Sequence, residues 1–241
     1  MRRLGNLSEI EYINAADLIG MDDEQTSEAL IEELGKMNPV KRQETVKKLI
    51  TTKIPSQGSR AEFEKHFIEL PQHAKENLQQ GKLRLADMLI YAIKPVTGHV
   101  TKMFKEQDVV QLNITNISKS RLPKNMTLLV SGIYLLQGQA ESLEEEALMQ
   151  TKFTSIESIG AIVNGEISFK VNKKDLLAPG QSNRSFIGGT SKGPIGYHKL
   201  DNPRLIPDDT EIELNIELGT IKGIPPNTVL LAGLHGTATI P

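Results

Sequence analysis

The chain has 241 residues, 38% hydrophobic and 24% charged, a composition typical of a globular protein with a buried core. The formal net charge is −2, and neither half has the basic excess of a dedicated polyanion binder. Cysteine is absent, which excludes disulfides, thiolate nucleophiles and cysteine-ligated metals. We see no signal-peptide pattern and no apolar run near the roughly 20 residues of a membrane span, so we expect synthesis and use in a cytoplasm.

Residues 1–108 carry the pattern of short, punctuated helices. The predicted helices cover residues 22–34, 39–54, 62–70 and 71–80. Pro71 stands at the permitted first position of the last of these, and Gly81 is its expected stop. The segment 83–93 is apolar without a clear period, so it suits a buried helix and a strand equally well.

After residue 108 the hydrophobic period changes to two, which predicts strands. These strands cover residues 110–116, 126–136, 149–156, 161–163, 167–171, 211–218 and 228–240. Gly132 is expected to mark a bulge or a point of close packing, and Asn164-Gly165 predicts a hairpin turn. Residues 173–206 contain five Gly and three Pro and are predicted to form a long irregular stretch. In a compact domain such a stretch is expected to be functional or to make intermolecular contacts.

The strand density defines the expected fold class. We predict an α+β chain, with a helical N-terminal arm or subdomain over residues 1–108 and an antiparallel β-sandwich over residues 109–241. A single jelly roll of eight strands in two sheets is the specific form expected. An immunoglobulin-like sandwich is the alternative, although the paired cysteines and buried tryptophan typical of that group are absent.

Residues with catalytic or metal-binding potential are scattered. The five histidines are His66, His73, His99, His198 and His235, and their spacing does not build a metal site. The glycine-rich segment 188–193 lacks the order of a phosphate-binding loop, and the acidic residues within 141–146 predict a solvated helix or turn. We therefore expect a protein that is not an enzyme and has no cofactor, metal or small-molecule substrate.

One basic cluster has a candidate function. Residues 36–53 contain six cations and a single acid, Glu44. The cluster is either a solvated helix side or a contact for phosphate groups of packaged nucleic acid or anionic lipid headgroups. The candidate contact residues are Lys41, Arg42, Lys47 and Lys48. Aromatic residues that would stack on bases are missing nearby, which argues against base-specific binding.

Three diffuse segments carry a family resemblance. They are residues 70–87, which run from Leu-Pro-Gln-His-Ala-Lys to Leu-Ala-Asp, residues 113–136, and residues 197–218. Together they resemble the jelly-roll structural proteins of tailless icosahedral bacteriophage capsids. Main shell proteins of that group commonly carry two jelly rolls per chain, whereas the strand count here supports one.

The resemblance implies a virion structural protein without an active site. Such a protein is a capsid subunit, in a major, vertex or accessory role, that assembles in the host cytoplasm. Its partners are copies of itself and other virion proteins, with non-specific contact to packaged nucleic acid or an internal membrane.

Two other functions remain open. A β-sandwich binding module would use residues 173–206 to bind a glycan or a peptide, with Phe186 and Tyr197 as the aromatic residues there. A cupin-like enzyme would need several strand histidines around a metal, and only His235 is expected on a strand.

Overall fold

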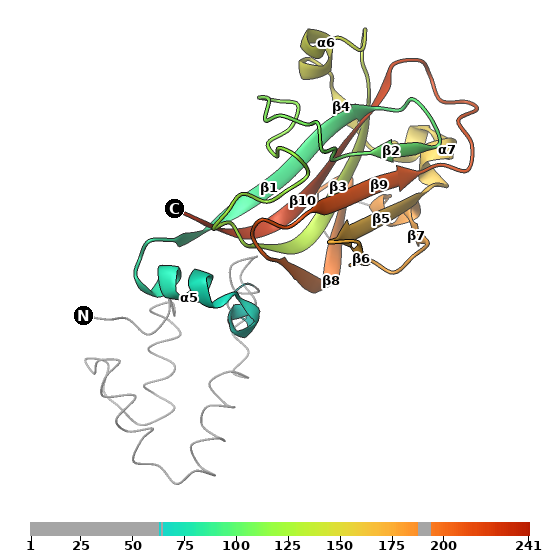
Figure 1. Ribbon diagram of the computed structural model, residues 1–241. Helices are drawn as coiled ribbons and strands as arrows, with labels where there is room; N and C mark the ends of the chain where they lie inside the picture. The colour runs from blue at the N-terminus through green and yellow to red at the C-terminus, as the bar shows by residue number, and fades with distance from the viewer. Residues whose placement is uncertain (1–62, 64, 188–193) are drawn as a thin grey trace, which may run out of the picture. The chain divides into compact units, whose positions relative to one another are not determined.

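The computed structural model describes Phe63, residues 65–187 and residues 194–241 (Figure 1). The chain divides into two compact units, residues 1–57 and 58–241, and the described residues belong to the second. They form two antiparallel sheets packed as a β-sandwich, with a few short helices, which confirms the predicted fold class. The helices predicted over 22–34 and 39–54 lie outside the described residues, as does the glycine-rich segment 188–193.

The first sheet is built from the long strands. Its order is β1 (Arg84–Pro95), β10 (Thr228–Ile240) and β3 (Leu128–Gln139), and both β4 (Phe153–Thr154) and β8 (Tyr197–Ile206) pair with β3. The second sheet has the order β2 (Val100–Lys102), β9 (Ile212–Glu217) and β5 (Glu166–Val171). The short strands β6 (Lys174–Asp175) and β7 (Gln181–Ser182) pair with β5.

The strand pairs are nested. β1 pairs with β10, β2 with β9, and β3 with β8, while β5 pairs with the short strands that follow it. The first strand of the sandwich therefore pairs with the last, β2 pairs with the strand before the last, and β3 pairs with the strand before that. This is the winding of a single jelly roll, as the sequence predicts.

Short helices cover the ends of the sandwich and the links between strands. They are η1 (Phe67–Glu69), α5 (Gln72–Gln79), α6 (Glu145–Met149), η2 (Ile156–Ser158), α7 (Gly160–Val163) and η3 (Asn183–Phe186). α5 confirms the helix predicted over 71–80, with Pro71 immediately before it and Gly81 at a φ of +70° just after it. No helix in the described part of the chain is long and apolar enough to cross a membrane.

The main core lies between the two sheets. Inward-facing residues of both sheets meet there, and among the largest that are fully buried are Phe169, Phe186, Met103 and Ile133. Burial of each such side chain stabilises the fold by about 1.5–3 kcal/mol. The strands predicted over 167–171, 211–218 and 228–240 are confirmed as β5, β9 and β10.

The domain boundary predicted at residue 108 does not hold. β1 and β2 both precede it, and β1 pairs with β10 along its whole length, from Arg84↔Ile240 to Pro95↔Val229. The sequence left 83–93 undecided because β1 has apolar residues on both faces, and such a strand loses the alternation of a half-solvated one. The sandwich therefore starts at β1.

The strand predicted over 110–116 is wrong. Gln111 and Thr115 exchange both of their backbone hydrogen bonds, at 2.9 Å each, across a tight turn. Asn113 sits in this turn at a φ of 63°, the left-handed conformation that asparagine tolerates better than most residues. The chain reverses there, so the apparent alternation makes isolated bridges in place of a strand.

Two predicted strands are mostly not strands. The segment 149–156 begins with the end of α6 and keeps only β4 as strand, while 161–163 lies in α7. Asn164-Gly165 is not a hairpin turn, because the Asn164 amide bonds to the Gly160 carbonyl and ends α7. Runs this short do not separate a helical turn from a strand by hydrophobicity alone.

The irregular stretch predicted over 173–206 contains the long strand β8. The register of β8 against β3 jumps between the pairs Val130↔Arg204 and Gly132↔Lys199. This interruption breaks the alternation that would reveal a strand in the sequence. The prediction for Gly132 is confirmed, because the registers with β8 and with β10 both shift beside it.

Candidate functional site

The outer face of the first sheet is apolar where water would ordinarily meet it. Inward-facing residues of β10, such as Leu230, Leu234 and Ala238, belong to the main core. Their neighbours Val229 and Leu231 point the other way and belong to a separate apolar cluster. An antiparallel sheet with one solvated face alternates apolar and polar residues, and β10 does not. This face is therefore built to be covered.

Both ends of that face are covered within the described residues. At one end, Phe63 and Leu70 pack on Leu129 of β3, next to η1 and α5. At the other end, Ile114 and Leu148 pack on the ends of β1 and β10. These two covers, with α5 below and α6 above, leave the middle of the sheet between them (Figure 1).

A row of tyrosines crosses the middle of this face, between the two covers. The register places Tyr91 of β1 opposite Gly233 of β10, Gly233 opposite Tyr134 of β3, and Tyr134 opposite Tyr197 of β8. Directly paired residues point to the same face of a sheet, so all three tyrosines lie on the outer face. Every tyrosine in the described part of the chain belongs to this row.

Partly exposed residues of neighbouring rows complete this surface, which we call the aromatic strip. The aromatic strip consists of Leu89, Tyr91, Tyr134, Leu136, Tyr197, Leu231 and His235. Strands lie about 4.8 Å apart, so the four strands span roughly 15 Å between their outer members. The strip is thus a short, shallow band that would accept a narrow apolar or aromatic segment.

Tyr134, Tyr197 and His235 form a compact ring cluster. The centroids of Tyr134 and Tyr197 are 4.8 Å apart, with the planes inclined by 42°. His235 meets both rings edge-on, at 6.1 Å from Tyr134 and 5.7 Å from Tyr197. The Tyr197 hydroxyl lies 3.5 Å from His235 Nδ1, a long polar contact. These geometries are favourable for aromatic pairs and hold the rings in place.

The phenol of Tyr197 has an altered pKa. Burial raises the pKa of the Tyr197 phenol above its ordinary value of 10.0, and the neighbouring Tyr134 raises it further. The phenol therefore remains neutral, and a donor, at any physiological pH. A phenol with a raised pKa is a weaker acid, and its basic phenolate form is scarcely populated near neutral pH, so the cluster fits contact better than acid–base chemistry.

A second exposed surface lies at the α6 end of the sandwich. Val109, Val110 and Leu112 are 75%, 59% and 80% exposed. Gln111 Nε2 donates to Glu145 Oε2 at 2.6 Å, which ties this loop to α6. We call Val109, Val110, Leu112, Leu143 and Met149 the end patch.

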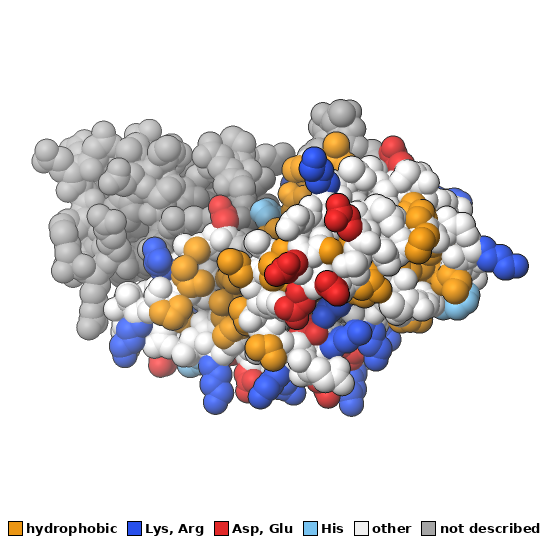
Figure 2. All heavy atoms as spheres, turned by 90° about the horizontal axis from the view of Figure 1, so that it is seen from above, with side chains coloured by type: hydrophobic (Ala, Val, Ile, Leu, Met, Phe, Trp, Pro, Cys, Tyr) orange, Lys and Arg blue, Asp and Glu red, His pale blue; other side chains and the backbone are white. Residues whose placement is uncertain are grey.

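Four acidic residues border the end patch and form what we call the acidic rim. They are Glu141, Glu144, Glu145 and Glu146, all exposed. None of the four makes an ion pair within the described residues. Figure 2 views this end of the sandwich and shows acidic side chains gathered beside hydrophobic ones.

A polar cavity of about 490 Å³ opens beside β3 and β4. Its lining includes Gln137, Lys152, Thr154 and Ser158. Gln137 Nε2 already donates to Ser158 Oγ at 2.6 Å and to Thr154 Oγ1 at 3.4 Å, so these polar groups satisfy one another.

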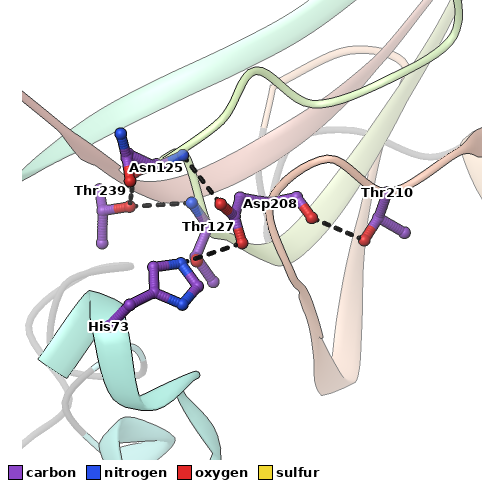
Figure 3. Close-up of polar contacts among 6 residues, drawn as sticks. All are labelled: His73, Asn125, Thr127, Asp208, Thr210 and Thr239. Atoms are coloured by element: carbon purple, nitrogen blue, oxygen red, sulfur yellow. Dashed lines mark hydrogen bonds and ion pairs between the residues drawn. The ribbon is translucent and has the colours of Figure 1, made fainter.

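Asp208 fastens α5 to the lower end of the sandwich (Figure 3). Its carboxylate accepts from the backbone amide of Asn125 at 2.9 Å and lies 3.2 Å from His73 Nε2. Thr239 continues the network, because its hydroxyl donates to the Asn125 carbonyl and accepts from the Thr127 amide. These groups all hold backbone or helix in place, which is a structural role.

The histidines singled out in the sequence are not brought together. His66 contacts Glu69 at 3.1 Å, His99 bonds to the Leu218 carbonyl at 2.8 Å, and His198 faces inward against the Phe186 ring. His235 alone joins the aromatic strip. Among the described residues, no group of three or more acidic or histidine side chains is placed to hold a metal.

The basic candidates Lys41, Arg42, Lys47 and Lys48 lie outside the described residues. Conversely, sequence reasoning did not single out Tyr91 or Tyr134. The available signal was the pattern of β10, where apolar residues occupy both faces. In comparisons with protein-family models, with curated proteins and with solved structures, the chain matches none.

Proposed function

We propose that this chain is a non-catalytic structural subunit that assembles with copies of itself as part of a virion shell. The observation that carries the proposal is the apolar outer face of the first sheet. Its two ends are covered within the chain, and its middle presents the aromatic strip. Aromatic residues are enriched at protein interfaces, because they bury a large area at little cost in conformational entropy.

The virion assignment has narrower support. The nested jelly roll is an architecture that viral capsid proteins use, but lectins and cupins use it too. The resemblance of residues 70–87, 113–136 and 197–218 to bacteriophage capsid proteins favours the first use. On this proposal the chain is a capsid subunit, in a major, vertex or accessory role, that joins other virion proteins in the host cytoplasm.

Light scattering and electron microscopy of the full-length chain test the assembly. We expect concentration-dependent oligomers or shells from the wild type. Tyr134→Glu places a charge in the aromatic strip and should shift the chain toward monomers. Ile221→Glu is the matched control, because Ile221 is exposed in a loop away from the strip. A wild type that stays monomeric at every concentration would contradict the proposal.

A binding module is the second candidate, and the aromatic strip favours it specifically. Tyr197 lies in the segment 173–206 that the binding-module alternative would use, and its ring lies beside those of Tyr134 and His235. Tyrosine rings with hydroxyl and imidazole groups alongside are able to stack on sugars and hydrogen-bond to them. Binding on a glycan array that Tyr134→Ala abolishes, by a chain that stays monomeric, would favour this function over assembly.

A further inference from the structure

The end patch exposes large apolar side chains that a folded chain ordinarily buries. Its loop residues Val109, Val110 and Leu112 are all more than half exposed, although Ile114 on the same loop is buried. The loop is held by the Gln111–Thr115 turn and by the Gln111–Glu145 hydrogen bond. These side chains are therefore displayed by a fixed backbone, which is how an interaction surface is built.

The acidic rim makes the border of the end patch negatively charged. It places four carboxylates around α6 and just before it. Lys94, on the strand below, is already neutralised by Asp108 at 2.6 Å, with both side chains largely buried. A partner for the end patch therefore needs apolar residues flanked by positive charge.

Residues 36–53 of this chain have the complementary composition. They carry six cations against one acid, together with the apolar residues Val40, Val46, Leu49 and Ile50. On a helix, Val46, Leu49 and Ile50 share one side, and Arg42 lies among them. Lys47 borders this side, and Lys41 and Lys48 lie on the opposite side.

We propose that the end patch and acidic rim bind residues 36–53 of a second copy of the chain. The inference rests on the proposed function of self-assembly, and it names one contact through which that assembly would occur. The apolar residues of the segment cover Val109, Val110 and Leu112, while its cations face the acidic rim. Charge complementarity of this kind selects the partner and its orientation as well as adding affinity.

A labelled synthetic peptide of residues 36–54, titrated with the full-length chain, tests the contact by fluorescence anisotropy. Saturable binding that weakens as salt is raised is expected. The triple variant Glu144→Lys/Glu145→Lys/Glu146→Lys should bind at least tenfold more weakly. The matched control Glu76→Lys/Glu157→Lys/Glu166→Lys makes the same charge change at exposed residues away from the end patch and should bind like the wild type.

Charge exchange separates a lost contact from a damaged fold. A peptide with Lys41, Lys47 and Lys48 each changed to Glu should fail to bind the wild type but bind the rim triple variant. The Leu112→Ser variant, in which the acidic rim is intact, should bind the wild-type peptide more weakly, because Leu112 supplies apolar contact area and no charge.

Light scattering of the same samples keeps the two proposals apart. A wild type that assembles but does not bind the peptide, or a rim variant that binds it as well as the wild type does, overturns this inference and leaves the proposed function standing. A monomeric wild type that still binds the peptide supports the site and overturns the proposed function. The contact is established if the rim triple variant binds the charge-reversed peptide and does not bind the wild-type peptide.

Discussion

The ring of Tyr197 lies across the backbone of Gly132, in the space that the Cβ of any larger residue would fill. Gly132 pairs with His235 on one side and Lys199 on the other, beside the point where both registers shift. The absence of a side chain at this position therefore allows Tyr197 to lean over β3 toward Tyr134. The close packing that the sequence suggested at this glycine is thus part of the aromatic strip.

Gly132→Ala should lower the free energy of unfolding by about 1–3 kcal/mol, because the new methyl group collides with the Tyr197 ring. Urea denaturation measures the change. In a Tyr197→Ala background the same substitution should cost clearly less, since the obstructing ring is gone. Gly98→Ala is the control, because no atom lies within 4 Å of a Cβ built there. Equal costs in the two backgrounds would show that Tyr197 is not the obstacle.

The raised pKa of Tyr197 predicts that the stability of the fold depends on pH in alkaline solution. Its pKa is raised above 10.0 in the folded chain, so the folded state keeps the phenol protonated where the unfolded state begins to lose the proton. The stability from this group is fully present below pH 10 and is lost as the pH rises through the folded pKa. Denaturation of wild type and Tyr197→Phe at several alkaline pH values should show the wild type losing stability faster. Parallel curves for the two proteins would rule out this linkage.

Asp208 should matter more than its neighbour Asp209. The Asp208 side chain is only 16% exposed and accepts a hydrogen bond from the Asn125 amide, so Asp208→Ala removes a bond to a charged acceptor. A loss of about 1–1.5 kcal/mol is expected, because Asn125 is exposed and water replaces the lost partner. His73→Ala should cost less than about 1 kcal/mol, because His73 is half exposed. Asp209→Asn serves as the surface control, because asparagine tolerates the left-handed φ of 51° at this position. Thermal unfolding compares the three variants.

The turn at Asn113 is predicted to need its left-handed residue. Asn113→Val should cost about 1–2 kcal/mol, because a β-branched side chain clashes with the backbone at a φ of 63°. Asn113→Gly should change stability by less than about 0.5 kcal/mol, since glycine adopts this conformation freely. Denaturation midpoints decide the matter, with Leu112→Ala as the neighbouring control that leaves the turn unchanged.

The strands with one apolar face were predictable from the sequence alone. β5 and β9 alternate because their inner side chains meet the core and their outer ones meet water. β1 and β8 were not recognised for two different reasons. β1 is apolar on both faces, and the register of β8 is interrupted near Pro203. Local periodicity reports how a strand is solvated, and it fails where another layer replaces the solvent.

The candidate site was the least predictable part. Tyr91, Tyr134 and Tyr197 are far apart in sequence, and only the pairing of four strands aligns them in one row. A one-residue shift of any strand would turn its tyrosine to the opposite face. A single sequence does not encode that register in any local pattern, so the aromatic strip emerges from the topology.

The nested pairing also has a consequence for how the protein folds. β10 lies between β1 and β3, and Arg84 contacts Pro241, 157 residues further along the chain. β1 and β3 therefore have no common partner strand until β10 has left the ribosome. Until then the apolar faces of β1 and β3 remain exposed to solvent. Chains dominated by such distant pairings fold slowly and are open to aggregation in the interval. Slow refolding from denaturant, with yields that fall as the protein concentration rises, is the behaviour that this winding should produce.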